Sequence, residues 1–423
     1  MSQLKVLIVG ASIAGPTAAY WFAKAGANVT VIERFPQLRS NGHNVDIRNV
    51  GVSVMRKIPG MEAAVQAKTV PMEGISFVRT DGRSYGIIRA TGNPDRQSLV
   101  SEYEIFRGDL AQILFDLTKD NENICYIFGE QVALMRQDEP DDNGPVTVEF
   151  ANGFPTSSFD LVVACDGATS RTRAIGLGRG VRDDIQSTNS WVAYCSMPQD
   201  LLAGSKLGHA YSAPGGRFIA AGADPSGMTR VAFMGIHPRD DHDAARPFRE
   251  AMERGDDALK QLVAQHYRGA GWKCDEAVEG MLEAEDFYAT EIVQVKPSCL
   301  YNGRFVLVGD AGYAPGPTGA GTSLALAGAY VLAGEVGSRC KGDLAAGLRG
   351  YEERMRPLID DLQKIPPGVL TFLAPQTAWG IWLRNTVFAL ICWTRVMEFV
   401  QLVFIGSFSN PDKYALPDYQ WVK

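Results

Sequence analysis

Several chemical features are scarce in this sequence of 423 residues, and each scarcity excludes a class of function. The seven cysteines are odd in number and include no CxxC pair, so we expect reduced thiols and a cytoplasmic location, not a disulfide framework. The five histidines show none of the spacings typical of metal ligands. We therefore expect no metal site.

Positive charge and long apolar runs are also lacking. The net charge of −7 argues against a nucleic-acid partner. Segment 366–408 is strongly apolar, but Arg384, Arg395 and Glu398 interrupt it, and none of its uncharged runs reaches the ~20 residues that span a bilayer. On a helical wheel its polar residues share one side, namely Arg384, Arg395, Glu398 and Gln401. We expect a helix packed across the folded domains, and a membrane-surface helix is the less favoured alternative.

Residues 4–33 carry the pattern of a dinucleotide-binding unit. A buried strand leads into GASIAG, a helix follows from Ala14, and a second strand ends at Glu33. Gly10 would make the tight turn, and Gly15 would let the helix pack on the strand. Glu33 stands where an acid accepts the ribose hydroxyls, which favours FAD or NAD over a 2′-phosphorylated nucleotide. The residues expected to contact this ligand are Gly10, Ser12, Ile13, Ala14, Gly15, Glu33 and Arg34.

Two further stretches allow two interpretations. FDLVVACDGATSRTR at 159–173 ends a strand at Asp166-Gly167, and EIFRGDL at 104–110 places Arg107 before a helix. Asp166 could bind a ligand or cap the helix that follows it. Arg107 could bind a phosphate or form a surface ion pair.

The stretch VLVGDAGYAPGPTGAGTSLALAGA at 306–329 combines a strand, a carboxylate and a stiff, small-residue loop. Asp310 at the strand end could accept hydrogen bonds from a ribityl chain. The positive end of the helix starting near Gly321 would stabilise a group that becomes anionic, as a reduced flavin does. The loop residues expected at the ring are Pro317, Gly319, Ala320 and Gly321.

Together these motifs resemble the class A flavin-dependent monooxygenases related to para-hydroxybenzoate hydroxylase, over roughly residues 1–360. Within that family the sequence is most similar to tetracycline-inactivating and fungal tailoring monooxygenases. VDIRNVG at 45–51, EDFYATEIVQVK at 285–296 and the loop 309–335 carry this likeness. It departs from the family at Gly312-Tyr313, where Ala-His is common, and at Gly319-Ala320-Gly321, where Gly-Gln-Gly is common.

The resemblance implies a function and residue roles. It implies an FAD- and NADPH-dependent monooxygenase that acts on an aromatic or polycyclic small molecule, with NADPH visiting without a Rossmann domain of its own. Glu33 would bind the adenosine ribose. Arg48, Arg107 and Asp310 would contact the flavin, its ribityl chain or its diphosphate. Asp166 would serve both FAD and nicotinamide.

The predicted fold class is α/β, with a Rossmann-like FAD-binding domain, an antiparallel-sheet substrate domain and C-terminal helices. The domains are predicted at 1–75, 100–183 and 297–360 for FAD, at 76–99 and 184–296 for substrate, and at 361–423 for the C-terminal segment. Arg217 and Tyr211 are the candidate catalytic residues, and Phe233 could also face the flavin. Alternatively, Arg217 is a surface cation and the aromatic side chains belong to the core.

Tetracycline inactivation by hydroxylation stays open as an alternative through the resemblance, and so do four other functions. A flavin halogenase is disfavoured because the WxWxIP signature is absent. A flavin-dependent reductase of isoprenoid chains, a flavin-binding scaffold without turnover, and a membrane-tethered binding module are the others. The sequence identifies neither the substrate nor the oligomeric state.

Overall fold

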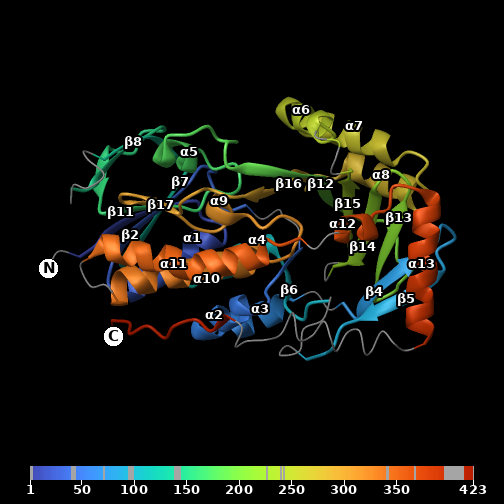
Figure 1. Ribbon diagram of the computed structural model, residues 1–423, viewed down its shortest axis with the longest axis horizontal. Coiled ribbons are helices and arrows are strands. Elements are labelled where there is room, and N and C mark those ends of the chain that lie inside the picture. The colour runs from blue at the N-terminus through green and yellow to red at the C-terminus, as the bar shows by residue number, and fades with distance from the viewer. Residues whose placement is uncertain are drawn as a thin grey trace.

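The computed structural model describes residues 3–39, 44–69, 72–93, 100–137, 144–224, 227–238, 241, 243–339, 343–365, 368–394 and 414–422. Two large sheets occupy opposite ends of the molecule, and the long strands β12 (Ile185–Met197) and β16 (Tyr288–Val295) extend from one end toward the other (Figure 1). The chain crosses between the two ends several times.

A six-stranded sheet forms the first end, in the order β17-β18-β11-β1-β2-β7. Its strands are β1 (Lys5–Val9), β2 (Asn28–Glu33), β7 (Ile124–Phe128), β11 (Leu161–Ala164), β17 (Tyr301–Asn302) and β18 (Phe305–Leu307). All neighbours pair in parallel except β17 with β18. The four residues of β1 from Val6 to Val9 are buried, as expected for a strand covered on both faces.

Different layers cover the two faces of this sheet. Val6 and Ile8 of β1 pack with helices α1 (Ala14–Lys24) and α10 (Gly321–Ala333), whereas Leu7 and Val9 face a three-stranded sheet. That sheet contains β8 (Val132–Arg136), β9 (Val146–Phe150) and β10 (Ser157–Phe159). Further elements here are α2 (Val50–Lys57), α3 (Met61–Lys68), α4 (Arg107–Asp116), α5 (Arg171–Leu177), α9 (Asp310–Tyr313), the π-helix η1 (Gly334–Arg339), α11 (Leu344–Leu362) and the pair β3 (Asn44–Asp46) and β6 (Glu104–Phe106).

A seven-stranded, mostly antiparallel sheet forms the second end, in the order β16-β12-β15-β14-β13-β4-β5. The remaining strands are β4 (Gly74–Val78), β5 (Ser84–Arg89), β13 (Gly208–Ala213), β14 (Arg217–Ala223) and β15 (Thr229–Ile236). Helices α6 (Arg246–Arg254), α7 (Asp256–Tyr267) and α8 (Cys274–Glu283) pack against one face, where Trp191, Ala193 and Cys195 lie. The other face meets α12 (Val369–Leu373) and α13 (Ala378–Trp393) at its edge.

The α/β fold class is thus confirmed, with both predicted kinds of sheet. The packing of the C-terminal helix differs from the prediction, because α13 contacts β5 and β13 of the seven-stranded sheet and does not lie across both ends. Arg384 faces inward and donates hydrogen bonds to the Leu373 carbonyl and the Asn385 side chain. Arg395, Glu398 and Gln401 lie outside the described residues. Among the helices that the structure describes, none has the length and apolarity needed to cross a membrane.

The end of the chain, residues 414–422, returns to the six-stranded end and packs beside α1 and α10 (Figure 1). The Trp421 ring lies 4.7 Å from the Trp21 ring, centroid to centroid, and Val422 N donates to the Lys24 carbonyl. The Tyr330 hydroxyl donates to the Pro417 carbonyl at 2.7 Å. These contacts close the end of α1 that is remote from the Gly10 loop.

Trp421→Ala should therefore lower the free energy of unfolding by about 1–3 kcal/mol, because a large aromatic contact is lost at a partly buried position. Trp393→Ala is the matched control, since Trp393 is 82% exposed on α13. Thermal and urea unfolding of both variants measure the difference. Equal losses in the two variants, or none in either, would contradict this account of the C-terminal segment.

Candidate active site

The carboxyl ends of four adjacent strands bring the predicted ligand-binding residues to one edge of the six-stranded sheet. Asp310 follows β18, Asp166 follows β11, Gly10 follows β1 and Glu33 ends β2. Such an edge is where open α/β sheets bind nucleotides. Residues separated by up to 300 positions thus share one location.

The Gly10–Gly15 loop leaves no room for side chains at its two glycines. Gly10 has φ +107°, and a Cβ there would lie 2.6 Å from the Cys165 carbonyl oxygen. A Cβ at Gly15 would lie 1.8 Å from the Gly10 carbonyl oxygen. Ser12, at the position of the usual middle glycine, is partly exposed, while Ile13 and Ala14 are buried. The loop therefore presents bare backbone at the start of α1, as a pyrophosphate requires.

Glu33 is held at this loop by two backbone donors. Its Oε2 accepts from Ala11 N at 2.9 Å, and its Oε1 accepts from Phe35 N at 3.2 Å. Arg34 is exposed and stacks on the Phe35 ring, with 4.8 Å from its guanidinium carbon to the ring centroid. The Glu33 carboxylate therefore lies beside the Gly10–Gly15 loop, and Arg34 follows it in the chain.

Arg39 is a basic residue that the sequence analysis missed. Burial lowers the pKa of Arg39, and the nearby positive charge of Arg107 lowers it further, while Glu33 opposes both effects. The charges of Arg107 and Glu33 thus both act on Arg39, although its side chain is exposed. Nothing in the local sequence around Arg39 indicates this, because Arg107 lies 68 positions away in the chain.

The Asp310 side chain is exposed, yet its surroundings desolvate the carboxylate. Its side chain is exposed, although Gly309, Ala311 and Gly312 around it are buried. Desolvation raises the pKa of Asp310, and the charge of Arg107 lowers it. A Cβ at Gly321, the first residue of α10, would lie 3.7 Å from Asp310 Oδ1. The carboxylate therefore adjoins both a cation and the positive end of a helix.

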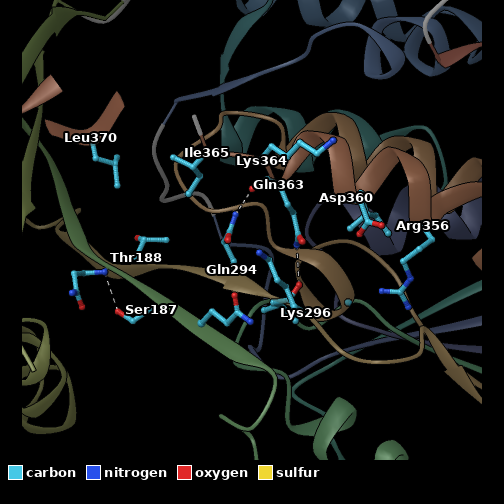
Figure 2. A pocket seen from close by; sticks show the side chains of 15 residues that line it. Ser187, Thr188, Gln294, Lys296, Arg356, Asp360, Gln363, Lys364, Ile365 and Leu370 are labelled. Atoms are coloured by element: carbon cyan, nitrogen blue, oxygen red, sulfur yellow. Dashed lines mark hydrogen bonds between the residues drawn. The ribbon is translucent and has the colours of Figure 1, made fainter. Parts of the chain in front are cut away.

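Two buried glutamines clamp the loop that follows Asp310. Gln294 Nε2 donates to the Pro315 carbonyl at 3.0 Å and to the Gln363 carbonyl at 2.6 Å. Gln363 Nε2 donates to the Ala314 carbonyl at 3.0 Å and to the Val295 carbonyl at 2.9 Å. Figure 2 shows both side chains at a cavity of about 690 Å³, whose charged lining residues are Lys296, Arg356, Asp360 and Lys364. The clamp fixes the start of the loop against β16 and the end of α11.

The remaining loop residues lie near Arg48. Pro317 and Gly321 are partly exposed, Gly319 is exposed with φ +74°, and Ala320 is buried. Arg48 forms an ion pair with Asp46 at 3.1 Å, and its backbone N donates to Ser323 Oγ of α10. A Cβ at Gly319 would lie 4.0 Å from Asp46 Oδ2. Arg48 and the loop therefore meet at one place.

Asp166 lies at the sheet edge, but its carboxylate is occupied by its own segment. It accepts from Ser170 Oγ at 2.5 Å, from Thr172 N at 3.2 Å and from Thr172 Oγ1 at 2.9 Å. Ser170 in turn caps α5 by accepting from Arg173 N. This is the helix-capping alternative, and the geometry gives no support to a ligand contact by this side chain.

Tyr313, one departure from the usual family motif, has a packing role. Tyr313, where histidine is common, is fully buried, and its hydroxyl lies 3.1 Å from the Tyr351 hydroxyl. Tyr351 donates to the Leu307 carbonyl of β18. A Cβ at Gly328 would collide with the Tyr313 hydroxyl, so the small residue on α10 makes space for this side chain.

A second cavity, of about 240 Å³, lies between the two ends of the molecule. One wall comes from β3 and β6, the other from the face of the seven-stranded sheet opposite α6–α8. Its polar and aromatic lining residues are Asn44, Glu104, Phe106, Tyr194, His209, Arg230, Asp286 and Tyr288. The sequence analysis named none of these as site residues. The available signal was the two-residue spacing of Glu104 and Phe106 in β6, directly before Arg107.

The two residues predicted to be catalytic lie elsewhere. Tyr211 belongs to the core under α6–α8, and its hydroxyl donates to the Ala270 carbonyl at 2.9 Å. Arg217 donates to the carbonyls of Pro214 and His266. Phe233 is fully buried in the same core. Because β-strand side chains alternate, these three residues point to the face opposite the 240 Å³ cavity, and the structure does not support their predicted roles.

Two expected absences can be examined for the described part of the chain only. There, no group of three or more histidine, cysteine or carboxylate side chains could hold a metal ion. Six cysteines fall within it, namely Cys125, Cys165, Cys195, Cys274, Cys299 and Cys392, and all six are free thiols.

Comparisons with known proteins agree with this geometry. The FAD binding domain family matches residues 3–364. The chain is 33% identical to the FAD-dependent monooxygenase asL4 of Sarocladium schorii, over 99% of each chain. Among solved structures, the tetracycline destructase Tet(51) superposes with a TM-score of 0.76 at 25% identity, covering 99% of this chain and 100% of that one.

A more distant structure shares the fold alone. HpxO of Klebsiella pneumoniae, complexed with FAD and uric acid, superposes with a TM-score of 0.71 at 20% identity, over 96% of this chain and 97% of that one.

Proposed function

Since this chain belongs to the FAD binding domain family of class A flavin monooxygenases, we propose that it uses NADPH and O2 to insert one oxygen atom into an aromatic or polycyclic small molecule. One observation carries the proposal: the bare Gly10 loop, Glu33, Arg107 and Asp310 meet at one sheet edge next to a clamped loop. Tailoring of a secondary metabolite by hydroxylation or epoxidation is the proposed reaction class, in the cytoplasm.

The residues fit FAD. The Gly10–Gly15 backbone and the start of α1 would hold the diphosphate, and Glu33 the adenosine ribose. Arg107, with Arg39 beside it, would neutralise phosphate charge. Asp310 would accept hydrogen bonds from the ribityl hydroxyls.

The loop 314–321 and helix α10 would position the flavin ring and stabilise its negative charge. Ala314 and Pro315 are fixed by the glutamine clamp, so the backbone that follows is presented in one conformation. The start of α10 would stabilise negative charge on the reduced ring. When bound, FAD supplies the electron transfer and the activation of O2. The protein supplies position, charge and the exclusion of water.

The 240 Å³ cavity is the proposed place of the substrate. It opens between β6, which leads directly into Arg107, and the face of the seven-stranded sheet not covered by α6–α8. Its Phe106, Tyr194 and Tyr288 side chains suit a flat ring. Tetracycline inactivation is the alternative, favoured by the likeness to Tet(51). Its four fused rings would require this cavity to enlarge.

Asp310→Asn should weaken FAD binding about 10- to 100-fold, because a charged acceptor of ribityl hydrogen bonds is replaced by a weaker one. Asp116→Asn on α4 is the matched control, since Asp116 is exposed and its ion pair with Lys119 lies on the surface. Titration of each apoprotein with FAD, followed by flavin fluorescence, gives the dissociation constants. An Asp310→Asn variant that binds FAD as tightly as the control would contradict the assigned role.

The function itself is tested with the FAD-loaded protein. NADPH should bleach the flavin absorbance without oxygen. With ¹⁸O₂ and a panel of naphthols, indoles and tetracycline, a substrate that accelerates NADPH oxidation should gain one ¹⁸O atom per product. A flavin that neither NADPH nor NADH reduces, or a product without ¹⁸O, would contradict the proposal.

A further inference from the structure

Glu104 occupies a distinctive place in the 240 Å³ cavity. It is the first residue of β6, and its Cα partner across the antiparallel ladder is Asp46 of β3. Asp46 in turn lies next to Gly319 of the loop that follows Asp310. Glu104 is therefore on the wall of the cavity nearest the proposed flavin site.

Among the described residues, only one of the two carboxyl oxygens of Glu104 forms a hydrogen bond. Asn44 Nδ2 donates to Glu104 Oε1 at 2.8 Å. Among the described residues, Glu104 Oε2 has no hydrogen-bond partner. The Glu104 side chain is partly exposed at the cavity, so Oε2 can exchange a hydrogen bond with a ligand there.

The surroundings favour the neutral acid. Burial is the largest cause that raises the pKa of Glu104, the carboxylate of Asp46 raises it further, and the Asn44 hydrogen bond and Arg48 oppose them. The pKa of Glu104 rises to about 7. Below that pH the group carries a proton and can donate, and above it the group can only accept.

Charged and titratable groups on the other walls do not change this picture. Arg230 is paired with Asp224 at 3.1 Å and with Asp286 at 3.4 Å, and its guanidinium covers the Phe106 ring at 4.0 Å. Burial lowers the pKa of His209, which favours the neutral imidazole.

The two phenols of the cavity, Tyr194 and Tyr288, lie on the seven-stranded sheet. Burial raises the pKa of Tyr194, so its hydroxyl keeps its proton at neutral pH. Among the described residues that line the cavity, Arg230 is the arginine, and two carboxylates, Asp224 and Asp286, already balance its charge.

We propose that Glu104 is a positioning residue for the substrate: its neutral carboxyl group donates a hydrogen bond from Oε2 to the carbonyl oxygen of an uncharged aromatic ketone, quinone or lactone. The inference rests on the proposed function only in taking this cavity as the substrate site. The ketone oxygen meets the acid, and the ring lies among Phe106, Tyr194 and Tyr288. A dry cavity of ~150 Å³ can bind benzene, so 240 Å³ admits a somewhat larger ring system.

The test uses the FAD-loaded protein and 6-fluoro-1-tetralone, a neutral bicyclic aromatic ketone that accepts but does not donate hydrogen bonds. Its dissociation constant is measured by ¹⁹F NMR line broadening between pH 6 and 9, which needs no flavin signal. Wild-type affinity should fall about 3- to 10-fold as the pH rises through 7, the range expected for loss of one hydrogen bond. The corresponding fluorotetralin, without the oxygen, should bind independently of pH.

Two variants of Glu104 separate positioning from a merely structural role. Glu104→Gln keeps both an acceptor for Asn44 and a donor, so tetralone should bind with nearly wild-type affinity at every pH. Glu104→Ala should bind it weakly at every pH. Glu285→Gln, an exposed residue outside the cavity lining, should retain the wild-type pH profile.

A wild-type profile that is flat, or one that persists in Glu104→Gln, would overturn the inference. These outcomes are distinct from failure of the proposed function. If tetralone binds with the expected profile but no panel compound gains ¹⁸O, the oxygenase proposal fails and the role of Glu104 in ligand binding stands.

Discussion

The close approach of backbone segments at the carboxyl edge of the six-stranded sheet is the constraint on which the rest of this structure depends. Gly10 lies against the Cys165 carbonyl, and Gly15 lies against Gly10, so neither position tolerates a Cβ. This packing keeps α1 close to its strand and leaves backbone donors facing outward. Glu33 and Asp310 then flank the loop because their strands are neighbours of β1 and β11.

A second set of interactions joins this sheet edge to the seven-stranded sheet. The carboxamides of Gln294 and Gln363 hold the loop after Asp310 to β16, a strand of the seven-stranded sheet. The β3–β6 pair reaches the same region from the other direction, with Asp46 near Gly319 and Glu104 in the cavity. The loop after Asp310 and the 240 Å³ cavity are therefore positioned by the same strands.

Much of the six-stranded end of the molecule could be predicted from the sequence, because the residue patterns that define its helices and strands are local. The start of α1 at Ala14, the end of β2 at Glu33 and the start of α10 at Gly321 agree with the structure, since glycines and β-branched runs define them within a few residues. Asp166 shows the limit of such signals, because an Asp-Gly turn looks the same whether it binds a ligand or caps a helix.

The seven-stranded end and its cavity were much harder to predict from the sequence. The residue types of Tyr211 and Arg217 suit a catalytic role, yet one position in a strand decides which face a side chain meets. Arg39, Glu104 and Asn44 acquire their importance from contacts with distant segments, which no local pattern encodes. The C-terminal helix was expected to cover both ends, but it packs at the edge of the seven-stranded sheet.

The most direct test of the central claim is a crystal structure of the protein with FAD bound. The account predicts the adenosine ribose at Glu33, the ribityl chain at Asp310, and the flavin ring between the loop 314–321 and the cavity that contains Glu104. A ring located on the α6–α8 side of the seven-stranded sheet, near Tyr211 and Arg217, or an adenosine remote from Glu33, would contradict it.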